Sequence, residues 1–544
     1  MTDRTGDRRR RLLVAAIAVC AGIAAALAHP PWGVLPGLLG YGVMLWLADR
    51  SAPQKPLRSA FWRGWLAGCG YFAVSLHWLV YPFYVDAAEQ AWMAPIAVVV
   101  VVTGIAVFWG AAMALYRRFA GRGVQRVLLF AGMLAGFEWL RGHVLTGFPW
   151  DLPGETWVAG SAPSQTASLV GAYGLSWITV AIFATFGVIR DGRSGVVASV
   201  VGVAALAGLY VFGAIRLAHP PGADVKAPWV RLVQPNVRQE ANYDQALFVR
   251  ILNQYVTLTR SPAARTPDIV VWPEGAIPAA LEDYLAPGTW TVRAVAEAVG
   301  PSSTLVLGGY RFSGDSSKPA IAYNSLVIAR PDGEKLKIEA LYDKFRLVPF
   351  GEYIPLDSLA GKLGVKELVH VGDGFASGPR PRPLTPPDVP AVQPLICYEV
   401  LFPGFTREGA AASGVRARWI VNVSTDAWFG PGAGPLQHFN IARYRAIEEG
   451  LPMARATPTG VSGMIDAFGR VAKGQSLGEG AYGVIDAPLP PALPATPFSR
   501  WGDTAFWLMM LVSLAGVGPS PVAGEGGRRP DEGTPASPIW HFET

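Results

Sequence analysis

The residue with the clearest chemical potential in this chain is Cys397. The sequence of 544 residues holds three cysteines, and the other two, Cys20 and Cys69, fall inside apolar stretches near the amino terminus. Three cysteines exclude a disulfide scaffold and a multi-cysteine metal site. A thiol that stands alone in its part of the chain is either an inert core residue or a nucleophile activated by a base and a cation. Its position alone leaves both alternatives open.

Two other residues could supply that base and that cation. Glu274 follows the apolar run Asp268–Trp272, and Lys344 lies in the segment Tyr342–Glu352. A carboxylate can accept the proton of a thiol, and a fixed ammonium group stabilises both a thiolate and the oxyanion of an attacked ester. Taken singly, Glu274 is equally well a solvated carboxylate at a strand end, and Lys344 is equally well a surface lysine. Acyl-transfer chemistry requires both of them beside Cys397.

The elements that must position these residues lie between residues 226 and 490, where short β-rich runs alternate with amphipathic stretches. The runs are almost continuously apolar, which is typical of a sheet buried on both faces, so they predict an α/β layered domain. Functional groups gather at the carboxyl ends of parallel strands, so Glu274 and Cys397 are expected at the same edge of the sheet if their strands are parallel. The expected strands are Val230–Val233, Asp268–Trp272, Thr304–Gly308, Ser325–Ala329, Pro394–Cys397 and Trp419–Val423, and the expected helices are 243–260, 289–299, 404–413 and 437–449.

The composition argues against a fully water-soluble protein. The chain is 51% hydrophobic and only 16% charged, whereas soluble chains carry about 25% charged residues. A helix needs about 20 apolar residues to cross a bilayer. A cleaved signal peptide is not favoured for the first apolar stretch, because further apolar stretches follow it at once. The eight stretches that predict membrane helices are 12–28, 33–48, 61–81, 93–115, 128–148, 165–188, 195–215 and 502–520.

The distribution of arginine and lysine predicts the orientation of these helices. Basic residues cluster before the first stretch and after the second, fourth and sixth, whereas the intervening loops are poor in them. Basic loops favour the cytoplasmic side, and the scattered positions suit membrane topology better than nucleic-acid binding. Glu138 and Arg141 stand one helical turn apart and are expected to pair within the membrane part. The expected divisions are a cytoplasmic amino terminus (1–11), a seven-helix transmembrane domain (12–216), an outer domain (226–490), an eighth transmembrane helix (502–520) and a disordered cytoplasmic tail (521–544).

Several short segments of the chain resemble one family. The order Glu274, Lys344, Cys397 is similar to the Glu-Lys-Cys triad of the nitrilase superfamily, and the surrounding segments resemble its membrane-embedded branch, the bacterial apolipoprotein N-acyltransferases. The resemblance covers about residues 12–517. The segments are Val233–Asn236, Trp272–Glu274, Tyr323–Ser325, Asp343–Glu352, Cys397–Glu399, Asn422–Gly430, Gln437–Phe439, Arg443–Ala446, Glu138–Gly142 and Thr146–Trp150.

The resemblance implies a specific architecture and reaction. Eight transmembrane helices would carry one periplasmic nitrilase-like αββα sandwich domain, in the inner membrane of a bacterium, with both termini cytoplasmic. The enzyme would move an acyl chain from a phospholipid to the free α-amino group of the diacylglyceryl-cysteine of apolipoproteins, through a cysteine thioester. No cofactor and no metal are implied, and a monomer is expected.

The resemblance also implies roles for individual residues. Cys397 would be the nucleophile and Glu274 the general base, while Lys344 and the backbone N–H of Tyr398 would stabilise the oxyanion. Glu352, Glu399 and Asn324 would support the triad, although Glu352 could be an ordinary loop acid and Asn324 an ordinary strand-edge residue. The candidates for a lid that touches substrate are Tyr243, where the family often has Trp, together with Trp428 and Phe429, for which core packing is the alternative.

Two other functions must be weighed against the same sequence features. A membrane-anchored amidase or nitrilase-type hydrolase of a small amide would need the same triad, but one helix is enough to anchor such an enzyme. A transporter with an outer regulatory domain would show internal repeats and charge-lined, broken helices, and the sequence shows no repeat and few charges in its apolar stretches.

Overall fold

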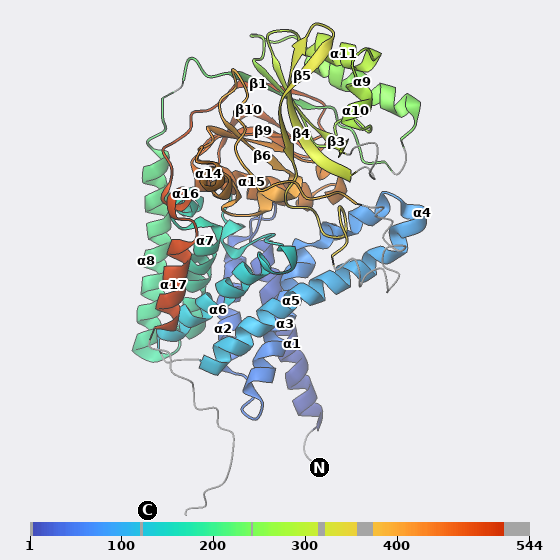
Figure 1. Ribbon diagram of the computed structural model, residues 1–544. Coiled ribbons are helices and arrows are strands. Elements are labelled where there is room, and N and C mark those ends of the chain that lie inside the picture. The colour runs from blue at the N-terminus through green and yellow to red at the C-terminus, as the bar shows by residue number, and fades with distance from the viewer. Residues whose placement is uncertain are drawn as a thin grey trace, which may run out of the picture.

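The computed structural model describes residues 4–119, 123–222, 224–240, 243–313, 321–355 and 374–515. Figure 1 shows two parts, a bundle of helices and, above it, a sandwich of two β-sheets. Helix α1 begins, and helix α17 ends, at the end of the bundle far from the sandwich. The expected disordered tail, 521–544, lies outside the described residues.

The bundle is built from the amino-terminal apolar stretches and one helix from the carboxyl-terminal region. The stretches form helices because they are rich in alanine and leucine, which favour helices, and because their backbone groups can bond within the segment. The elements of the bundle are α1 (Arg4–Leu27), η1 (Leu35–Leu39), α2 (Gly40–Asp49), α3 (Pro56–Ser75), η2 (His77–Tyr84), α4 (Ala87–Gln90), η3 (Ala91–Met93), α5 (Ala94–Phe119), α6 (Gln125–Arg141), η4 (Val144–Thr146), η5 (Pro153–Thr156), η6 (Pro163–Thr166), α7 (Ala167–Ala184), η7 (Thr185–Val188), α8 (Gly192–Leu217) and α17 (Thr504–Leu514).

The expected set of eight membrane helices is not confirmed. In the described part of the chain, four helices are long and apolar enough to span a bilayer, and the pair formed by α3 and η2, bent by 50°, could make a fifth. In their described residues, the stretches 33–48 and 502–520 contain the shorter apolar helices Leu35–Asp49 and Thr504–Leu514. In the stretch 128–148, helix α6 ends at Arg141 and is 17 residues long. The four spans are Arg8–Leu27, Ala87–Phe119, Pro163–Val188 and Gly192–Leu217.

Small residues let the helices of the bundle approach closely. A Cβ atom on Gly22 would lie 1.8 Å from the carbonyl oxygen of Ala67, and one on Gly70 would lie 2.3 Å from that of Val19. Helices α1 and α3 therefore meet backbone to backbone, as small residues allow in membrane proteins. The expected pair of Glu138 and Arg141 is present and buried, and Trp109 donates a hydrogen bond of 2.6 Å to the same glutamate.

The sandwich consists of two mixed sheets. The six-stranded sheet has the order β11-β1-β2-β3-β4-β5, and the five-stranded sheet has the order β10-β9-β8-β7-β6. Within them, β1, β2 and β3 are parallel, as are β6, β7 and β8, and the remaining pairs are antiparallel. The strands are β1 (Trp229–Gln234), β2 (Ile269–Trp272), β3 (Thr304–Ser313), β4 (Ile321–Asp332), β5 (Lys335–Asp343), β6 (Val392–Ile396), β7 (Trp419–Val423), β8 (Met453–Ala456), β9 (Ser462–Ile465), β10 (Val471–Leu477) and β11 (Gly483–Pro488).

All six expected strands and all four expected helices of this domain are present. Strands β5 and β8 to β11 were not expected, and one inference about the strands was wrong. Glu274 and Cys397 do not share a sheet, because β2 belongs to the six-stranded sheet and β6 to the five-stranded one. Both residues follow the carboxyl end of a parallel strand, so they reach one site from two sheets.

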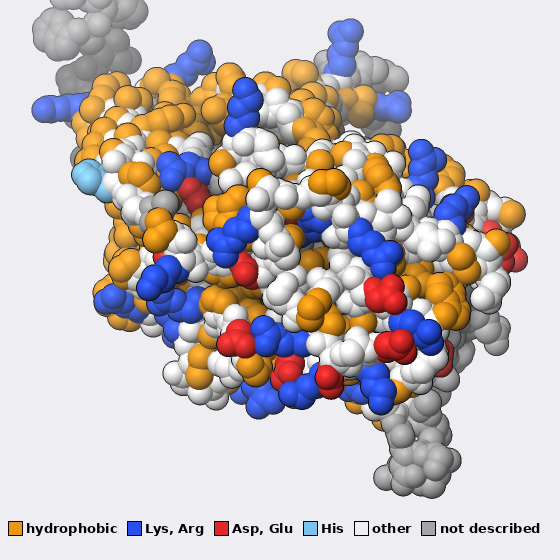
Figure 2. Space-filling model, turned by 90° about the horizontal axis from the view of Figure 1, so that it is seen from above, with side chains coloured by type: hydrophobic (Ala, Val, Ile, Leu, Met, Phe, Trp, Pro, Cys, Tyr) orange, Lys and Arg blue, Asp and Glu red, His pale blue; other side chains and the backbone are white. Residues whose placement is uncertain are grey.

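Helices cover the outer face of each sheet, so the layers run helix, sheet, sheet, helix. The core between the sheets joins residues such as Val271 and Val306 to Val421 and Val423. Helices α9 (Gln245–Thr259), α10 (Leu281–Tyr284) and α11 (Trp290–Val299) close the outer face of the six-stranded sheet (Figure 1). Figure 2 shows the sandwich from above, with basic and acidic side chains intermixed over its surface.

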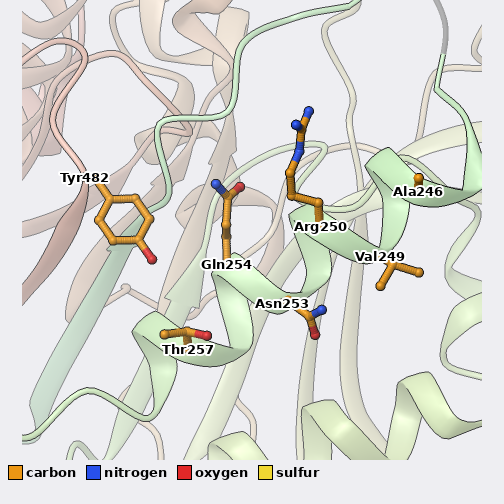
Figure 3. A pocket seen from close by; sticks show the side chains of 7 residues that line it. All are labelled: Ala246, Val249, Arg250, Asn253, Gln254, Thr257 and Tyr482. Atoms are coloured by element: carbon orange, nitrogen blue, oxygen red, sulfur yellow. The ribbon is translucent and has the colours of Figure 1, made fainter.

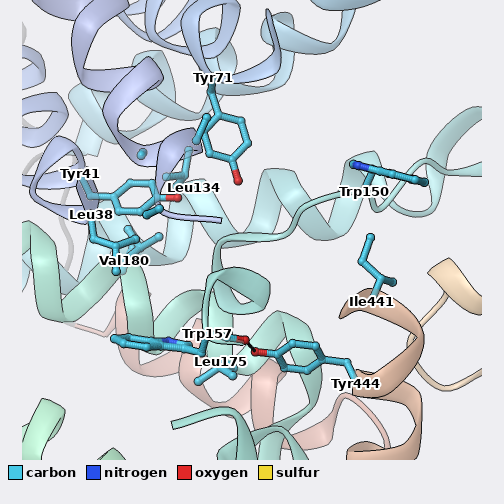
Figure 4. Packing of buried hydrophobic residues seen from close by; sticks show 14 of the residues in the cluster. Leu38, Tyr41, Tyr71, Leu134, Trp150, Trp157, Leu175, Val180, Ile441 and Tyr444 are labelled. Carbon is cyan, nitrogen blue, oxygen red and sulfur yellow. Dashed lines mark hydrogen bonds between the residues drawn. The ribbon is translucent and has the colours of Figure 1, made fainter. Parts of the chain in front are cut away.

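The helical bundle and the sandwich share one hydrophobic core. Helix α15 (Ala433–Glu449) lies between the five-stranded sheet and the bundle. Its residues Ile441 and Tyr444 belong to the same buried cluster as Trp150 and Trp157 of the bundle (Figure 4). The Tyr444 hydroxyl donates a hydrogen bond of 2.6 Å to the Trp157 carbonyl. The sandwich is therefore docked on the bundle through a buried interface.

Candidate active site

Cys397 lies at a sharp turn between β6 and the short 3₁₀ helix η8 (Cys397–Leu401). Its φ angle is +46°, in the left-handed region, and its side chain is buried. A non-glycine residue in that region costs about 1–3 kcal/mol and persists where the surroundings impose it. Here the carboxylate of Glu399 accepts a hydrogen bond of 2.8 Å from the backbone N–H of Ile396. A hydrogen bond between two residues that flank Cys397 therefore stabilises the turn.

Glu274 follows β2, with its side chain 8% exposed. One carboxylate oxygen accepts a hydrogen bond of 2.8 Å from the backbone N–H of Thr425, in the loop after β7. The other accepts one of 2.7 Å from the Asn324 amide and lies 3.4 Å from the Lys344 Nζ. These three contacts fix the carboxylate between the two sheets.

Lys344 directly follows β5 and is 1% exposed. Its Nζ lies 2.9 Å from a carboxylate oxygen of Glu352, and the Asn324 amide donates hydrogen bonds of 2.7 Å to both Glu352 and Glu274. Burial lowers the pKa of Lys344, but the charges of Glu352, Glu274 and Cys397 outweigh burial and leave the pKa above its ordinary value. The amine is therefore a permanent cation at physiological pH.

The charges of Glu274 and Lys344 both shift the pKa of the Cys397 thiol. Burial raises its pKa most, and the Glu274 charge raises it further, while the Lys344 charge and a hydrogen bond with Ser424 lower it. The net shift is upward, so the thiol is protonated at neutral pH. It becomes a nucleophile only when a base removes its proton during attack. Glu274, Lys344 and Cys397 thus lie together, and the geometry can support nucleophilic acyl transfer.

Glu399 ties the cysteine turn to the lysine segment. It is fully buried, and one carboxylate oxygen accepts hydrogen bonds from the Tyr342 hydroxyl at 2.7 Å and from the backbone N–H groups of Phe345 at 2.7 Å and Arg346 at 3.1 Å. The other oxygen accepts the bond from Ile396. Burial raises the pKa of Glu399 to about 7, although the hydrogen bonds and Lys344 oppose the rise.

A buried polar network behind the thiol was not singled out from the sequence. Ser424 donates a hydrogen bond of 2.7 Å to Asp426, which also lies 2.7 Å from Arg455 and 2.9 Å from His438. Burial raises the pKa of Asp426, but Arg455 and His438 outweigh it and hold that pKa below its ordinary value. Asp426 and His438 lie in segments that carried the resemblance, which is the only signal for them that the sequence offered.

The other expected site residues fall in two groups. Asn324 and Glu352 contact the triad. Tyr398 follows Cys397 and donates a hydrogen bond to the Gly147 carbonyl of the bundle. Tyr243 lies before α9, and its hydroxyl accepts a bond of 3.2 Å from the backbone of Glu240. No described contact joins Tyr243 to the triad.

Trp428 and Phe429 lie together in the 3₁₀ helix η9 (Asp426–Phe429) but in different surroundings. Trp428 is 40% exposed. The Phe429 ring packs against Trp78 and Trp150 of the bundle, with ring centroids 4.7 Å and 5.4 Å apart. Phe429 thus has the contacts of a packing residue, whereas Trp428 remains free for contact with a substrate.

The cavity in Figure 3 lies elsewhere. It has a volume of about 440 Å³ and is formed by one face of α9 with Tyr482, and none of the triad residues lines it. In the described part of the chain, no group of three or more His, Cys, Asp or Glu side chains is placed to hold a metal ion.

Comparison with known proteins assigns a family model to each part of the chain. The apolipoprotein N-acyltransferase N-terminal domain matches residues 21–185, and the carbon-nitrogen hydrolase domain matches residues 230–494. The apolipoprotein N-acyltransferase of Caulobacter vibrioides is 52% identical over 92% of this chain and 93% of its own length, and that of Bradyrhizobium diazoefficiens is 38% identical over 92% and 93%. An amidase of the nitrilase superfamily from Nesterenkonia AN1, known in structure, covers 49% of this chain and 93% of its own, with 17% identity and a TM-score of 0.33.

Proposed function

Because this chain belongs to the apolipoprotein N-acyltransferase family, we propose that it moves an acyl chain from a membrane phospholipid to the free α-amino group of the diacylglyceryl-cysteine of apolipoproteins. The mechanism rests on one observation: the buried thiol of Cys397 lies close enough to the Glu274 carboxylate and to the Lys344 ammonium group for both charges to shift its pKa. No other cysteine lies in the described part of the sandwich.

The first half of the reaction acylates the enzyme. Glu274 takes the proton of the Cys397 thiol, and the sulfur attacks the ester carbonyl of the phospholipid. Lys344 and the backbone N–H of Tyr398 stabilise the oxyanion that forms, and one such donor is worth about 3 kcal/mol. When the oxyanion collapses, the C–O bond of the ester breaks. The departing lysophospholipid oxygen takes the proton from Glu274, and a thioester remains on Cys397.

The second half of the reaction transfers the acyl group to the lipoprotein. The free amine of the acceptor attacks the thioester, and Glu274 accepts the proton that the amine loses. The C–S bond then breaks, an amide forms, and the thiol of Cys397 regains a proton from Glu274. Water must be excluded from the thioester, because hydrolysis would otherwise compete with transfer to the amine. The docking of the sandwich on the bundle supports this exclusion of water.

The membrane arrangement is part of the proposal. Residues 12–216 and 502–520 would supply eight transmembrane helices, with both termini in the cytoplasm and residues 226–490 in the periplasm. The alternating basic loops support this orientation. So does the position of α1 and α17, whose outer ends lie at the side of the bundle opposite to the sandwich. We further propose that the protein acts as a monomer in the bacterial inner membrane.

Labelled phospholipid tests this function. After incubation with a phospholipid labelled in its acyl chain, the full-length protein should carry label that hydroxylamine removes, because hydroxylamine cleaves thioesters. The Cys397→Ala variant should carry none, and the Cys69→Ala variant, as a control, should be labelled like the wild type. A diacylated lipopeptide with a free amino terminus should then receive the label as an amide. Release of the label only to water would instead identify a hydrolase.

A further inference from the structure

Arg346 is a cation beside the site that the proposed mechanism does not use. It lies two residues after Lys344, and Glu399 binds its backbone N–H at 3.1 Å and that of Phe345 at 2.7 Å. The same carboxylate holds the cysteine turn through Ile396. The backbone at Arg346 is therefore fixed relative to the nucleophile.

The guanidinium group of Arg346 has no anionic partner in the described part of the chain. It lies 4.2 Å from the ring centre of Phe402, and its Nε is buried without a hydrogen bond. Two other arginines of the sandwich, by contrast, have an anionic partner: Arg311 lies 2.7 Å from Asp343 and Arg231 lies 2.7 Å from Asp486. Buried donors are ordinarily satisfied, so an unpaired guanidinium at a reactive site points to a ligand with acceptor oxygens.

A second unsatisfied donor lies in the same region. The hydroxyl of Tyr353 is buried and has no hydrogen-bond partner among the described residues. Tyr353 directly follows Glu352, whose carboxylate lies 2.9 Å from the Lys344 Nζ, and its backbone carbonyl accepts a hydrogen bond of 2.8 Å from the Phe350 N–H. Tyr353 and Arg346 therefore both belong to the segment that holds Lys344 at the site.

This group of residues faces the seam between the sandwich and the bundle. The Tyr398 hydroxyl binds the Gly147 carbonyl of the bundle. A Cβ atom on Gly147 would lie 3.0 Å from the Phe402 ring, which is the ring that Arg346 stacks on. Arg346 therefore lies close to the contact between the sandwich and the bundle.

We infer that Arg346, assisted by the Tyr353 hydroxyl, binds the phosphodiester of the donor phospholipid while the acyl ester of that lipid lies at Cys397. The inference rests on the proposed function. The planar guanidinium suits two phosphate oxygens at once, and the phosphodiester is the anion that a phospholipid carries within a few bonds of its ester. The acceptor carries no anion beside its amine, so Arg346 would act in the first half of the reaction only.

The test separates the two halves of the reaction in the full-length protein. Wild type, Arg346→Gln, Arg346→Lys and Arg418→Gln are compared, where Arg418 is an exposed arginine before β7 whose charge has no described partner. The second-order rate constant for thioester formation from phosphatidylglycerol is measured first. Each protein is then loaded at saturating phospholipid, and discharge to a diacylated lipopeptide is timed.

A charge-assisted contact of this kind predicts that Arg346→Gln lowers the rate constant for thioester formation by about 10- to 100-fold. Arg346→Lys should recover part of the loss, Arg418→Gln should behave as wild type, and discharge to the lipopeptide should be unchanged in all four. A Tyr353→Phe variant should show a smaller loss in the same step.

Equal rate constants for thioester formation in wild type and Arg346→Gln would overturn the phosphodiester site and leave the proposed function standing. Equal losses in both halves would show a structural role and would also overturn it. A wild type that takes no label from phospholipid would instead refute the proposed function, and this inference with it.

Discussion

Replacing Glu399 with glutamine should make the stability of the protein depend less on pH. The folded-state pKa of Glu399 is about 7 because the side chain is fully buried, against an ordinary value of 4.5. A carboxyl with a raised pKa binds more protons in the folded than in the unfolded state between these values. Its contribution to stability is therefore greatest below pH 4.5 and is lost as the pH rises through 7.

The size of this effect follows from the shift. A difference of about 2.5 pH units corresponds to about 3 kcal/mol, since each unit is worth 1.36 kcal/mol. Glutamine does not titrate, so the stability of Glu399→Gln relative to wild type should improve by about 3 kcal/mol between pH 4.5 and pH 8. The variant should still be less stable than wild type at low pH, because an amide leaves at least one of the surrounding donors unpaired, at a cost of about 1–3 kcal/mol.

Urea unfolding in detergent, followed by tryptophan fluorescence at a series of pH values, measures this difference. Glu408→Gln provides the control, because Glu408 is exposed on α14 (Phe405–Ser413) and should follow the wild-type curve. If wild type and Glu399→Gln differed by the same free energy at every pH, the buried carboxyl would not be titrating and our interpretation of this contact would be wrong.

Three further predictions follow from the site. Burial and the Glu274 charge raise the thiol pKa of Cys397, so iodoacetamide should alkylate Cys397 at pH 8 at least about 10-fold more slowly than a free exposed thiol. The rate should still rise above pH 9. Fast alkylation at pH 7, measured by mass spectrometry, would contradict the upward pKa shift. Lys344→Met should slow thioester formation by about 100-fold, as expected for one oxyanion donor, whereas Lys337→Met on the exposed side of β5 should not; equal rates would remove Lys344 from the mechanism. Residues 226–490 produced without the bundle should transfer no acyl chains in detergent, because Ile441 and Tyr444 would lose their buried contacts; transfer equal to that of the full chain would show that the bundle is not needed.

The sequence predicted those strands of the sandwich that have a simple hydrophobicity pattern. Buried parallel strands such as β2 and β7 are continuous apolar runs, and these were found. Strand β10, with the sequence VAKGQSL, is largely polar because it is not fully buried, and it was missed. Nothing in the pattern assigned β2 and β6 to different sheets, because strand pairing depends on contacts between residues far apart in the chain.

The site was predictable to a similar extent. Glu274 and Cys397 could be proposed because each follows the end of a predicted strand, and Lys344 because the order of the three residues resembles the triad of the nitrilase superfamily. The network of Asp426, His438 and Arg455 could not be proposed, because its significance lies in complete burial, which residue type does not reveal. Arg346 likewise became conspicuous only in the structure, where its buried Nε has no hydrogen-bond partner among the described residues.

In the proposed mechanism, an acyl group from a phospholipid passes through the sulfur of Cys397. Mass spectrometry of peptides from the full-length protein, taken after incubation with a phospholipid of defined chain length, tests it most directly. We predict that the peptide containing Cys397 gains the mass of that acyl chain and loses it when a diacylated lipopeptide is added, with the same mass appearing on the lipopeptide amine. Acylation of the lipopeptide without any acyl mass on Cys397, or with that mass on another residue, would contradict the claim.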